Sequence, residues 1–313
     1  MEKIQTENLK KIYKKWGKQA LILREIEKWK YFEIENIDCS TVTLSNQYNN
    51  EKKIFFGFVN LLNNIQKAKQ LFNEIEKYCK SISKQEIIGP INYSTWFDYR
   101  LMTNGFENSK IYPEPTNPKY IPELLEQIGY KKYKTYNSIL QKTNDSKLNY
   151  FKEKYEQVIS NGFNIKRYKG YKIAFVLKYI YDISIDAFAE NPLFSPITKK
   201  MFKKYYVSGF KKSNTKILPI VNICYKNYEP IAFSYSYINP YGKDQYVWKT
   251  TGVKKQYQKN NIGSAFRYIV HKTALENNCS NVIYHLTFEK NPVRNLLDKG
   301  KIIKEYALFS KKI

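Results

Sequence analysis

The sequence has few residues of the kinds that build metal sites and disulfide frameworks. Four cysteines stand far apart without a CxxC pair, and there are only two histidines. Neither set has the spacing of metal ligands, so we expect no metal site. We expect the cysteines to be buried free thiols, which fits a reducing compartment. The residues concerned are Cys39, Cys79, Cys224, Cys279, His271 and His285.

Long apolar runs are absent as well. No stretch approaches about 18 consecutive apolar residues, which is the length that a membrane-spanning helix needs. The N-terminal segment MEKIQTENLKKIYKKWGK carries charge but no apolar centre, unlike a signal peptide. We therefore expect a cytoplasmic protein without a membrane span.

Arginine is scarce in a chain that is otherwise strongly basic. The 53 cationic residues are 48 Lys and 5 Arg, against 28 acidic residues, which gives a formal net charge of +25. Such a charge normally indicates nucleic acid or an anionic surface. Arg, however, is the side chain that reads phosphates and bases with paired hydrogen bonds, and the Lys residues here are interrupted by Glu. We expect the charge to be spread over the surface and do not expect nucleic acid as the partner.

The chain is long and apolar enough for two domains. It has 313 residues, of which 42% are hydrophobic and 16% aromatic. Its most polar central stretch, SILQKTNDSKLNYF, places a boundary near residue 145 and gives domains at 1–145 and 146–313. Both halves alternate strand and helix patterns, which predicts the α/β class with mixed sheets.

The first half contains one clear βαβ unit. Apolar residues at helical spacing run from Leu61 to Tyr78, between the strand-like segments KKIFFGFV and KQEIIGPI. A segment rich in proline follows from Ile111, and ELLEQIGY within it predicts a helix that ends at a glycine.

The second half opens with a helix after Asn144-Asp145-Ser146 and continues with two helical pieces separated by Pro192 and Pro196. Three strand segments with tight turns then predict an antiparallel meander: KILPIVNICYK, PIAFSYSYIN and QYVWKTTGV. A helix from Ile262 to about Glu276, the strand NVIYHLTF, a short helix after Asn291-Pro292 and a last strand KIIKEYALF complete the chain.

The segment VKKQYQKNNIGS, residues 253–264, joins the end of a strand to the start of a helix. Backbone N–H groups in the first turn of a helix have no partner within the helix, and the dipole is positive there. Such a helix start holds phosphate oxygens. Gly263 leaves room in the first turn, Asn261 tolerates a left-handed backbone, and Lys254, Lys255 and Lys259 add positive potential. We therefore predict that the N–H groups of residues 259–264 bind a pyrophosphate.

With its flanks, TTGVKKQYQKNNIGSAFRYIVHKTAL, this segment resembles motif A of the GNAT superfamily of acyl-CoA-dependent N-acyltransferases. Gln258 stands at the Gln/Arg position of that motif, Asn261 at the first Gly and Gly263 at the second. The resemblance covers most of residues 150–313. It implies acetyl-CoA or another acyl-CoA as co-substrate, held between two splayed strands by Val253, Gln258, Lys259, Asn260, Asn261, Ile262, Gly263, Ser264, Asn291 and Arg294.

The first half resembles the same fold in the degenerate form of tandem members. FFGFVNLLNNIQKAKQLFNEIEKYC and EIIGPINYSTWFDYRLMTNGFE carry this likeness, and no Gly-rich loop precedes the helix at Leu61. We therefore expect this half to bind no cofactor and to shape the acceptor site. Trp96, Tyr99 and Arg100 on a short helix, with Glu114 in the Pro-rich loop, are its candidate substrate-binding residues.

Catalysis in this family is direct attack of an amine on the thioester. The resemblance makes the backbone amide of Val253 the candidate oxyanion donor. Tyr284 and His285 are neighbours on one strand and face opposite sides of the sheet, so one of them should face the site. His285 is the more usable base, although a histidine bonded within the sheet is the plainer interpretation. The segment after Asn291 has no Tyr at the position where many members carry the thiolate acid, so the acid is unassigned.

Three function classes remain open at this point. The first is N-acyl transfer from acyl-CoA to an amine of a small molecule or peptide. The second is aminoacyl transfer from charged tRNA, as Fem-type enzymes of the same tandem fold perform, for which the net charge speaks. The third is a non-catalytic CoA-binding module. The acceptor, the acyl chain length and the oligomeric state do not follow from the sequence.

Overall fold

The computed structural model describes residues 29–34, 40–45, 50–144, 146–212, 218–242, 244–291 and 300–313. The chain forms two compact units. The first comprises residues 1–106, 115–136 and 304–313, and the second comprises 107–114 and 137–303. No helix among the described residues is long and apolar enough to cross a membrane.

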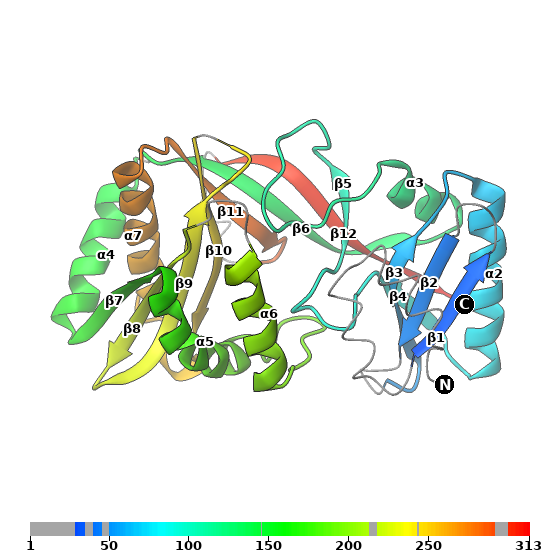
Figure 1. Ribbon diagram of the computed structural model, residues 1–313, viewed down its shortest axis with the longest axis horizontal. Helices are drawn as coiled ribbons and strands as arrows, with labels where there is room; N and C mark the ends of the chain where they lie inside the picture. The colour runs from blue at the N-terminus through cyan, green and yellow to red at the C-terminus, as the bar shows by residue number, and fades with distance from the viewer. Residues whose placement is uncertain are drawn as a thin grey trace. The chain divides into compact units, whose positions relative to one another are not determined.

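The first unit is built on a mixed sheet in the order β1-β2-β3-β4-β12, with β5 pairing with β12 (Figure 1). All neighbours pair antiparallel except β3 and β4, which are parallel and joined by helix α2. This is the βαβ unit expected from the sequence. Its elements are β1 Trp29–Ile34, β2 Ser40–Ser45, β3 Lys53–Asn60, α2 Ile65–Ser81, β4 Glu86–Gly89, β5 Leu101–Asn104, α3 Tyr120–Gln127 and β12 Lys301–Lys312.

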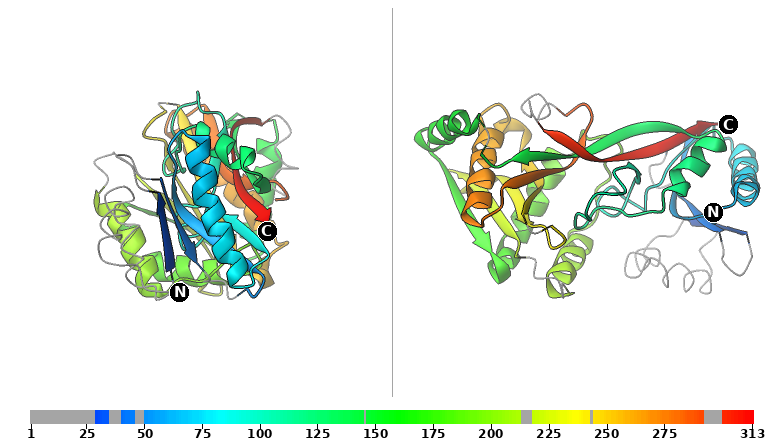
Figure 2. Two further views of the ribbon diagram at one scale, coloured as in Figure 1. Left: turned by 90° about the vertical axis from the view of Figure 1, so that its right-hand side faces the viewer. Right: turned by 90° about the horizontal axis from the view of Figure 1, so that it is seen from above.

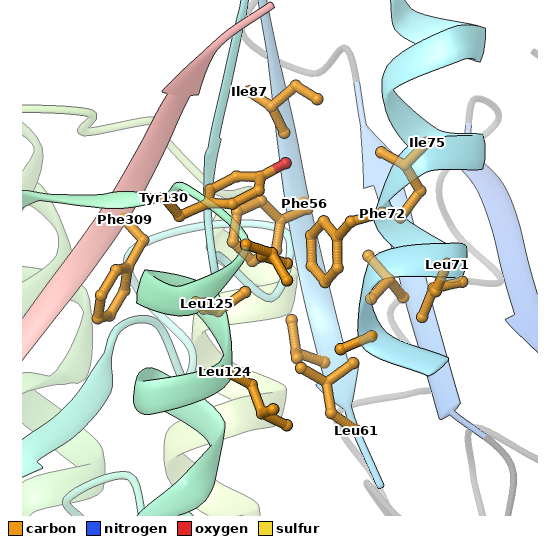
Figure 3. Packing of buried hydrophobic residues seen from close by; sticks show 14 of the residues in the cluster. Phe56, Leu61, Leu71, Phe72, Ile75, Ile87, Leu124, Leu125, Tyr130 and Phe309 are labelled. Carbon is orange, nitrogen blue, oxygen red and sulfur yellow. The ribbon is translucent and has the colours of Figure 1, made fainter. Parts of the chain in front are cut away.

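Helix α2 lies against this sheet and closes its core (Figures 2 and 3). Its first turn is capped by the Asn64 side chain, which accepts a hydrogen bond from the Lys67 amide at 3.0 Å. The buried residues Leu71, Phe72 and Ile75 share one face of the helix. The Phe72 ring packs edge-on against Phe56 of β3 and Tyr130 at centroid distances of 5.8 and 5.1 Å.

The second unit contains a mixed sheet in the order β6-β11-β10-β9-β8-β7 (Figure 1). Strands β8, β9 and β10 form the expected antiparallel meander, and β7 adds to its edge. The described elements are β6 Lys131–Lys142, α4 Leu148–Ser160, β7 Phe163–Lys169, α5 Ile173–Ala187, α6 Lys199–Lys212, β8 Ile220–Lys226, β9 Glu229–Ile238, β10 Gln245–Val253, α7 Ile262–Glu276 and β11 Asn281–Phe288, with short 3₁₀ turns at Gly170–Lys172 and Lys255–Tyr257.

The two faces of this sheet carry different helices. Helices α4 and α7 lie side by side (Figures 1 and 2) and share a core with the sheet face that presents Ala232, Tyr246 and Tyr284. Helix α5 packs on the opposite face, where Phe188 at its end contacts Phe233 with a centroid distance of 6.4 Å. Because successive strand residues alternate between faces, Tyr284 faces α7 and its neighbour His285 faces away from α7.

The structure differs from the sequence-based expectation at the middle of the chain. A single boundary near residue 145 was expected, whereas the contacts divide the chain between Tyr136 and Asn137, inside strand β6. The last residues, 304–313, belong to the first unit. The cause is strand pairing, since the end of β12 pairs with β4 and β5. Strands β1, β2, β5, β6 and β7 were not predicted.

Candidate functional site

Strands β10 and β11 form a fork in the second unit. They pair in parallel from Gln245↔Asn281 to Trp248↔Tyr284, and their pairing ends there, although β10 continues to Val253 and β11 to Phe288. A β-bulge interrupts the pairing of β10 with β9 between Trp248 and Thr250, at the same level. A bulge bends its strand away from its neighbours, so this irregularity accounts for the separation. The splayed strand pair that the resemblance implied is present.

The backbone of Val253 points into this fork. Lys254 donates its N–H to the carbonyl of Ile231 on β9 at 2.9 Å. In an antiparallel ladder, hydrogen-bonding groups alternate between the two sides of a strand. The N–H and C=O of Val253 therefore point away from β9, toward the side from which β11 has separated.

The loop after β10 leads into α7 through two left-handed residues. Lys259 has φ 70° and Asn261, the N-cap of α7, has φ 57°. Asn261 thus adopts the backbone conformation that favours glycine, which explains how it replaces the first Gly of the motif. The first helical hydrogen bond runs from Ala265 N to Asn261 O at 2.9 Å, and the helix has no side-chain cap. The N–H groups of Ile262, Gly263 and Ser264 therefore point out of the helix start.

Gly263 leaves the surface of this first turn open. Its φ is not positive, and a Cβ placed on it would meet no atom within 4 Å. Neither backbone strain nor crowding within the protein accounts for a glycine here. A glycine inside a helix costs about 1 kcal/mol relative to alanine. The position therefore keeps backbone N–H groups accessible at some cost to helix stability.

Polar contacts hold this loop in place. Lys254 pairs with Glu229 at 2.6 Å, and Lys255 pairs with Glu190 at 2.7 Å. The Lys254 contact lowers the pKa of the Glu229 carboxyl, and the Lys255 contact lowers that of Glu190. The expectation that both lysines add positive potential is therefore wrong, because each is paired with a carboxylate. Lys254 is half-buried, whereas Lys255 and Lys259 are exposed.

Two further predicted residues act within the loop itself. The Gln258 side chain donates to the carbonyl of Val253 at 3.3 Å, which ties the loop to the end of β10. The Asn260 side chain donates to the carbonyl of Tyr257 at 3.1 Å. In this structure both side chains stabilise the loop conformation that presents the helix start.

His285 lies on the fork, one residue beyond the last paired position of β11. Its side chain is 8% exposed, and Nε2 lies 3.9 Å from Oε1 of Glu114, whose side chain is 1% exposed. The hydroxyl of Ser138 on β6 donates a hydrogen bond to the same Glu114 oxygen. The structure thus brings together two residues that the sequence analysis assigned to different tasks, His285 as base and Glu114 as acceptor ligand.

Tyr284 is held in the core by His271. The Nε2 atom of His271 lies 3.0 Å from the Tyr284 hydroxyl, and Nδ1 lies 3.1 Å from the carbonyl of Thr143. His271 is fully buried and Tyr284 is 3% exposed, with its ring against Trp248 at a centroid distance of 5.1 Å. Tyr284 therefore faces α7 and not the face that carries His285. Of the two candidates on β11, His285 is the one that lies on the opposite face of the sheet, beside Glu114.

The candidate acceptor residues do not form the expected short helix. Residues 92–100 consist of turns and a bridge between Ile91 and Tyr99. The guanidinium of Arg100 packs against the rings of Tyr99 and Tyr136, at 3.6 and 3.8 Å from their centroids. Trp96, Tyr99 and Arg100 belong to the first unit, whereas Glu114 belongs to the second. Asn291 is exposed and lies three residues beyond the end of β11, while Arg294 and the predicted short helix lie outside the described residues.

The first unit has a comparable fork that its own residues close. Strands β3 and β4 pair from Lys53↔Glu86 to Phe55↔Ile88, and β4 then ends at Gly89. Beyond that point the Ile91 amide donates to Phe56 O at 2.7 Å, and the Asn92 side chain accepts from Phe58 N at 2.7 Å. A Cβ on Gly57 would lie 2.1 Å from the carbonyl oxygen of Ile91, so the backbones touch there. Asn92 lies in the segment that carried the resemblance, but it was not predicted to close this fork.

No protein-family model matches the chain, and no curated protein matches it. Solved structures do. A conserved protein of unknown function from Enterococcus faecalis V583, described as a probable N-acyltransferase, superposes with a TM-score of 0.57 at 9% identity, over 99% of this chain and 71% of that one.

Two other solved structures resemble the chain. A GCN5-related glucosamine N-acetyltransferase region of a fungal multi-domain β-N-acetylglucosaminidase has a TM-score of 0.51 at 9% identity, over 97% of this chain and 36% of that one. A tandem GNAT protein from the clavulanic acid biosynthesis pathway has a TM-score of 0.49 at 5% identity, over 91% and 83%. At such identities the two likenesses with TM-scores above 0.5 establish the fold and nothing finer.

Proposed function

We propose that this chain, which has the GNAT fold, is an acyl-CoA-dependent N-acyltransferase. The observation that carries the proposal is the fork between β10 and β11 beside the uncapped start of α7. In an α/β sheet, ligands bind at the carboxyl ends of strands, next to helix N-termini that accept phosphate groups. Here the loop from Lys254 to Asn261 joins the two features, and Gln258 ties it to Val253.

Each residue of the site has one task in the proposed reaction. The N–H groups of Ile262, Gly263 and Ser264 bind the pyrophosphate of CoA, and the fork receives its pantetheine arm. The acceptor amine attacks the thioester carbonyl, so that a C–N bond forms and the C–S bond breaks. The N–H of Val253 donates to the developing oxyanion. His285 takes the proton that the amine loses, and the sulfur leaves as a thiolate.

The same reasoning assigns no CoA to the first unit. On β3, the N–H of Phe58 lies beyond the last residue pair with β4 and is already bonded to Asn92. Helix α2 is capped by Asn64, unlike α7. We propose that this unit contributes to recognition of the acceptor, with Trp96 and Tyr99 as candidate contacts.

Thermal unfolding with added ligands tests the proposal. A ligand at 100 times its Kd stabilises the folded state by about 2.7 kcal/mol. We expect acetyl-CoA to raise the melting temperature of the wild-type chain and total tRNA at physiological salt to leave it unchanged. A shift with tRNA alone contradicts the proposal and supports aminoacyl transfer of the Fem type. Binding of acetyl-CoA without release of free CoA thiol in the presence of a broad panel of amines supports the binding-module alternative.

A further inference from the structure

Residues 107–114 form a segment that lies apart in sequence from the rest of the second unit but packs within it. Ile111 is 3% exposed and belongs to a cluster with Tyr237, Val247 and Ile283. The Asn239 side chain donates to the carbonyl of Lys110 at 3.0 Å, and the Tyr237 hydroxyl donates to the carbonyl of Tyr112. The segment is therefore held against β9, β10 and β11, on the sheet face that carries His285.

This segment ends by burying a carboxylate next to the imidazole. The side chain of Glu114 is 1% exposed and that of His285 is 8% exposed, with 3.9 Å between Oε1 and Nε2. Burying an ionised carboxylate is costly unless hydrogen bonds and an opposite charge compensate it. A protonated imidazole at this distance supplies that charge.

Ser138 connects the carboxylate to the backbone beside His285. Its hydroxyl donates to Glu114 and accepts a hydrogen bond from the Leu286 amide at 3.2 Å. Leu286 follows His285 directly and has φ 46°, a left-handed conformation that is rare for leucine. The segment 107–114, β6 and β11 thus each contribute a residue to the contacts around the His285 imidazole and the Glu114 carboxylate.

Three other ionisable groups described on this face, Tyr235, Tyr237 and Lys249, do not replace Glu114. Burial raises the pKa of Tyr237 well above its usual value, with Tyr235 and Glu114 raising it further, and burial likewise raises the pKa of Tyr235. Both phenols are therefore neutral near pH 7. Lys249 of β10 lies with Nζ 5.6 Å from the ring centroid of Tyr235 and carries a charge of the wrong sign to stabilise an imidazolium.

We propose that Glu114 is the positioning residue of His285, and that Ser138 fixes the Glu114 carboxylate in the place where it stabilises the protonated imidazole. The inference deepens the proposed function, since it explains how His285 accepts and holds the proton of the amine. Glu114 does not touch the acyl donor in this scheme but acts through the ring.

Two histidines in the chain make a direct test practical. An NMR titration of the imidazole resonances in the full-length protein gives the pH midpoint of His285. His271, which is buried and contacts Thr143 and Tyr284 through its two ring nitrogens, serves as the reference. A His285→Gln variant assigns the signals. An opposite charge at about 4–6 Å raises the pKa of an imidazole by roughly one unit or more. Glu114→Gln keeps the shape and removes the charge, so we expect the His285 midpoint to fall by at least that amount.

Two further variants separate positioning from structural support. We expect the His285 midpoint of Glu114→Asp to lie between those of Glu114→Gln and the wild type. We expect Ser138→Ala to lower this midpoint by less than Glu114→Gln does. If Glu114→Gln shifts the midpoint by less than about half a unit or raises it, the inference is wrong. This readout does not require acyl transfer: a shifted midpoint in a protein that binds no acyl-CoA contradicts the proposed function and leaves the pairing intact. Where activity is present, we expect Glu114→Gln to lower kcat more than it changes KM.

Discussion

Gly263→Asp separates phosphate binding from folding at the start of α7. The position is open, with no atom within 4 Å of a Cβ placed there, so the new side chain meets no steric obstacle. The first turn of α7 contains no acidic residue. An acid there interacts favourably with the helix dipole by about 0.3–1 kcal/mol, and replacing glycine removes part of its entropic cost. We therefore expect the free energy of unfolding to stay the same or to rise by about 1 kcal/mol.

The same substitution should weaken CoA binding. A carboxylate about 4 Å from a phosphate charge repels it by about 1 kcal/mol in water and about 4 kcal/mol at the effective dielectric near a protein surface. We expect a loss of at least about fivefold in affinity for each phosphate charge, measured by isothermal titration with CoA. A variant that unfolds as late as the wild type but binds CoA poorly identifies α7 as the phosphate site.

A matched control carries the same charge to another helix start. Helix α2 also has no acidic residue in its first turn, and Gln66 there is exposed. We expect Gln66→Asp to leave CoA affinity unchanged. Gly263→Val, which adds bulk without charge, should also abolish binding while the fold persists. If Gly263→Asp and Gly263→Val bind CoA as the wild type does, the pyrophosphate lies elsewhere and the reasoning on this helix is wrong.

Three further outcomes follow from the buried groups. Tyr284→Phe removes the hydrogen bond to His271 and should cost about 1 kcal/mol of stability in urea unfolding while turnover persists; loss of turnover with full stability would return a catalytic role to Tyr284. Asn92→Ala leaves the buried Phe58 N–H without its partner and should cost about 1–3 kcal/mol without changing CoA affinity; a gain of a second CoA per chain would contradict the closed fork of the first unit. Burial raises the pKa of Cys79, Cys224 and Tyr246 to about 12, so the unfolded chain loses these protons first as pH rises. Stability should therefore be full below about pH 9 and fall between about pH 9 and 12, and urea midpoints that stay constant over that range would refute this explanation.

The parts of the fold that were predictable from the sequence have strong local signals. Helix α7 begins and ends where the apolar periodicity placed it, at Ile262 and Glu276, and the meander β8–β10 has apolar strands with clear turns. Strand β6 was missed because KKYKTYNSILQK has polar residues throughout and seven of its twelve residues are not buried. The helix expected around Trp96 was wrong, since Tyr93 and Arg100 have positive φ values that interrupt a helix.

In the candidate site, too, features with a local sequence signal were predictable and features that form only through packing were not. The helix start could be predicted because loop, glycine and helix are contiguous in the sequence. The pairing of Glu114 with His285 could not, because the two residues come together only through the packing of residues 107–114 against the sheet. Asn92, which closes the fork of the first unit, lies in the segment EIIGPINYST that carried the resemblance, but its bond to Phe58 forms only when that segment packs beside β3.

A crystal structure of the chain with bound CoA tests the central claim most directly. The account predicts one CoA per chain, with the pyrophosphate on the N–H groups of Ile262, Gly263 and Ser264 and the pantetheine arm between β10 and β11. CoA bound at the fork of β3 and β4, or at a surface away from the start of α7, would contradict it.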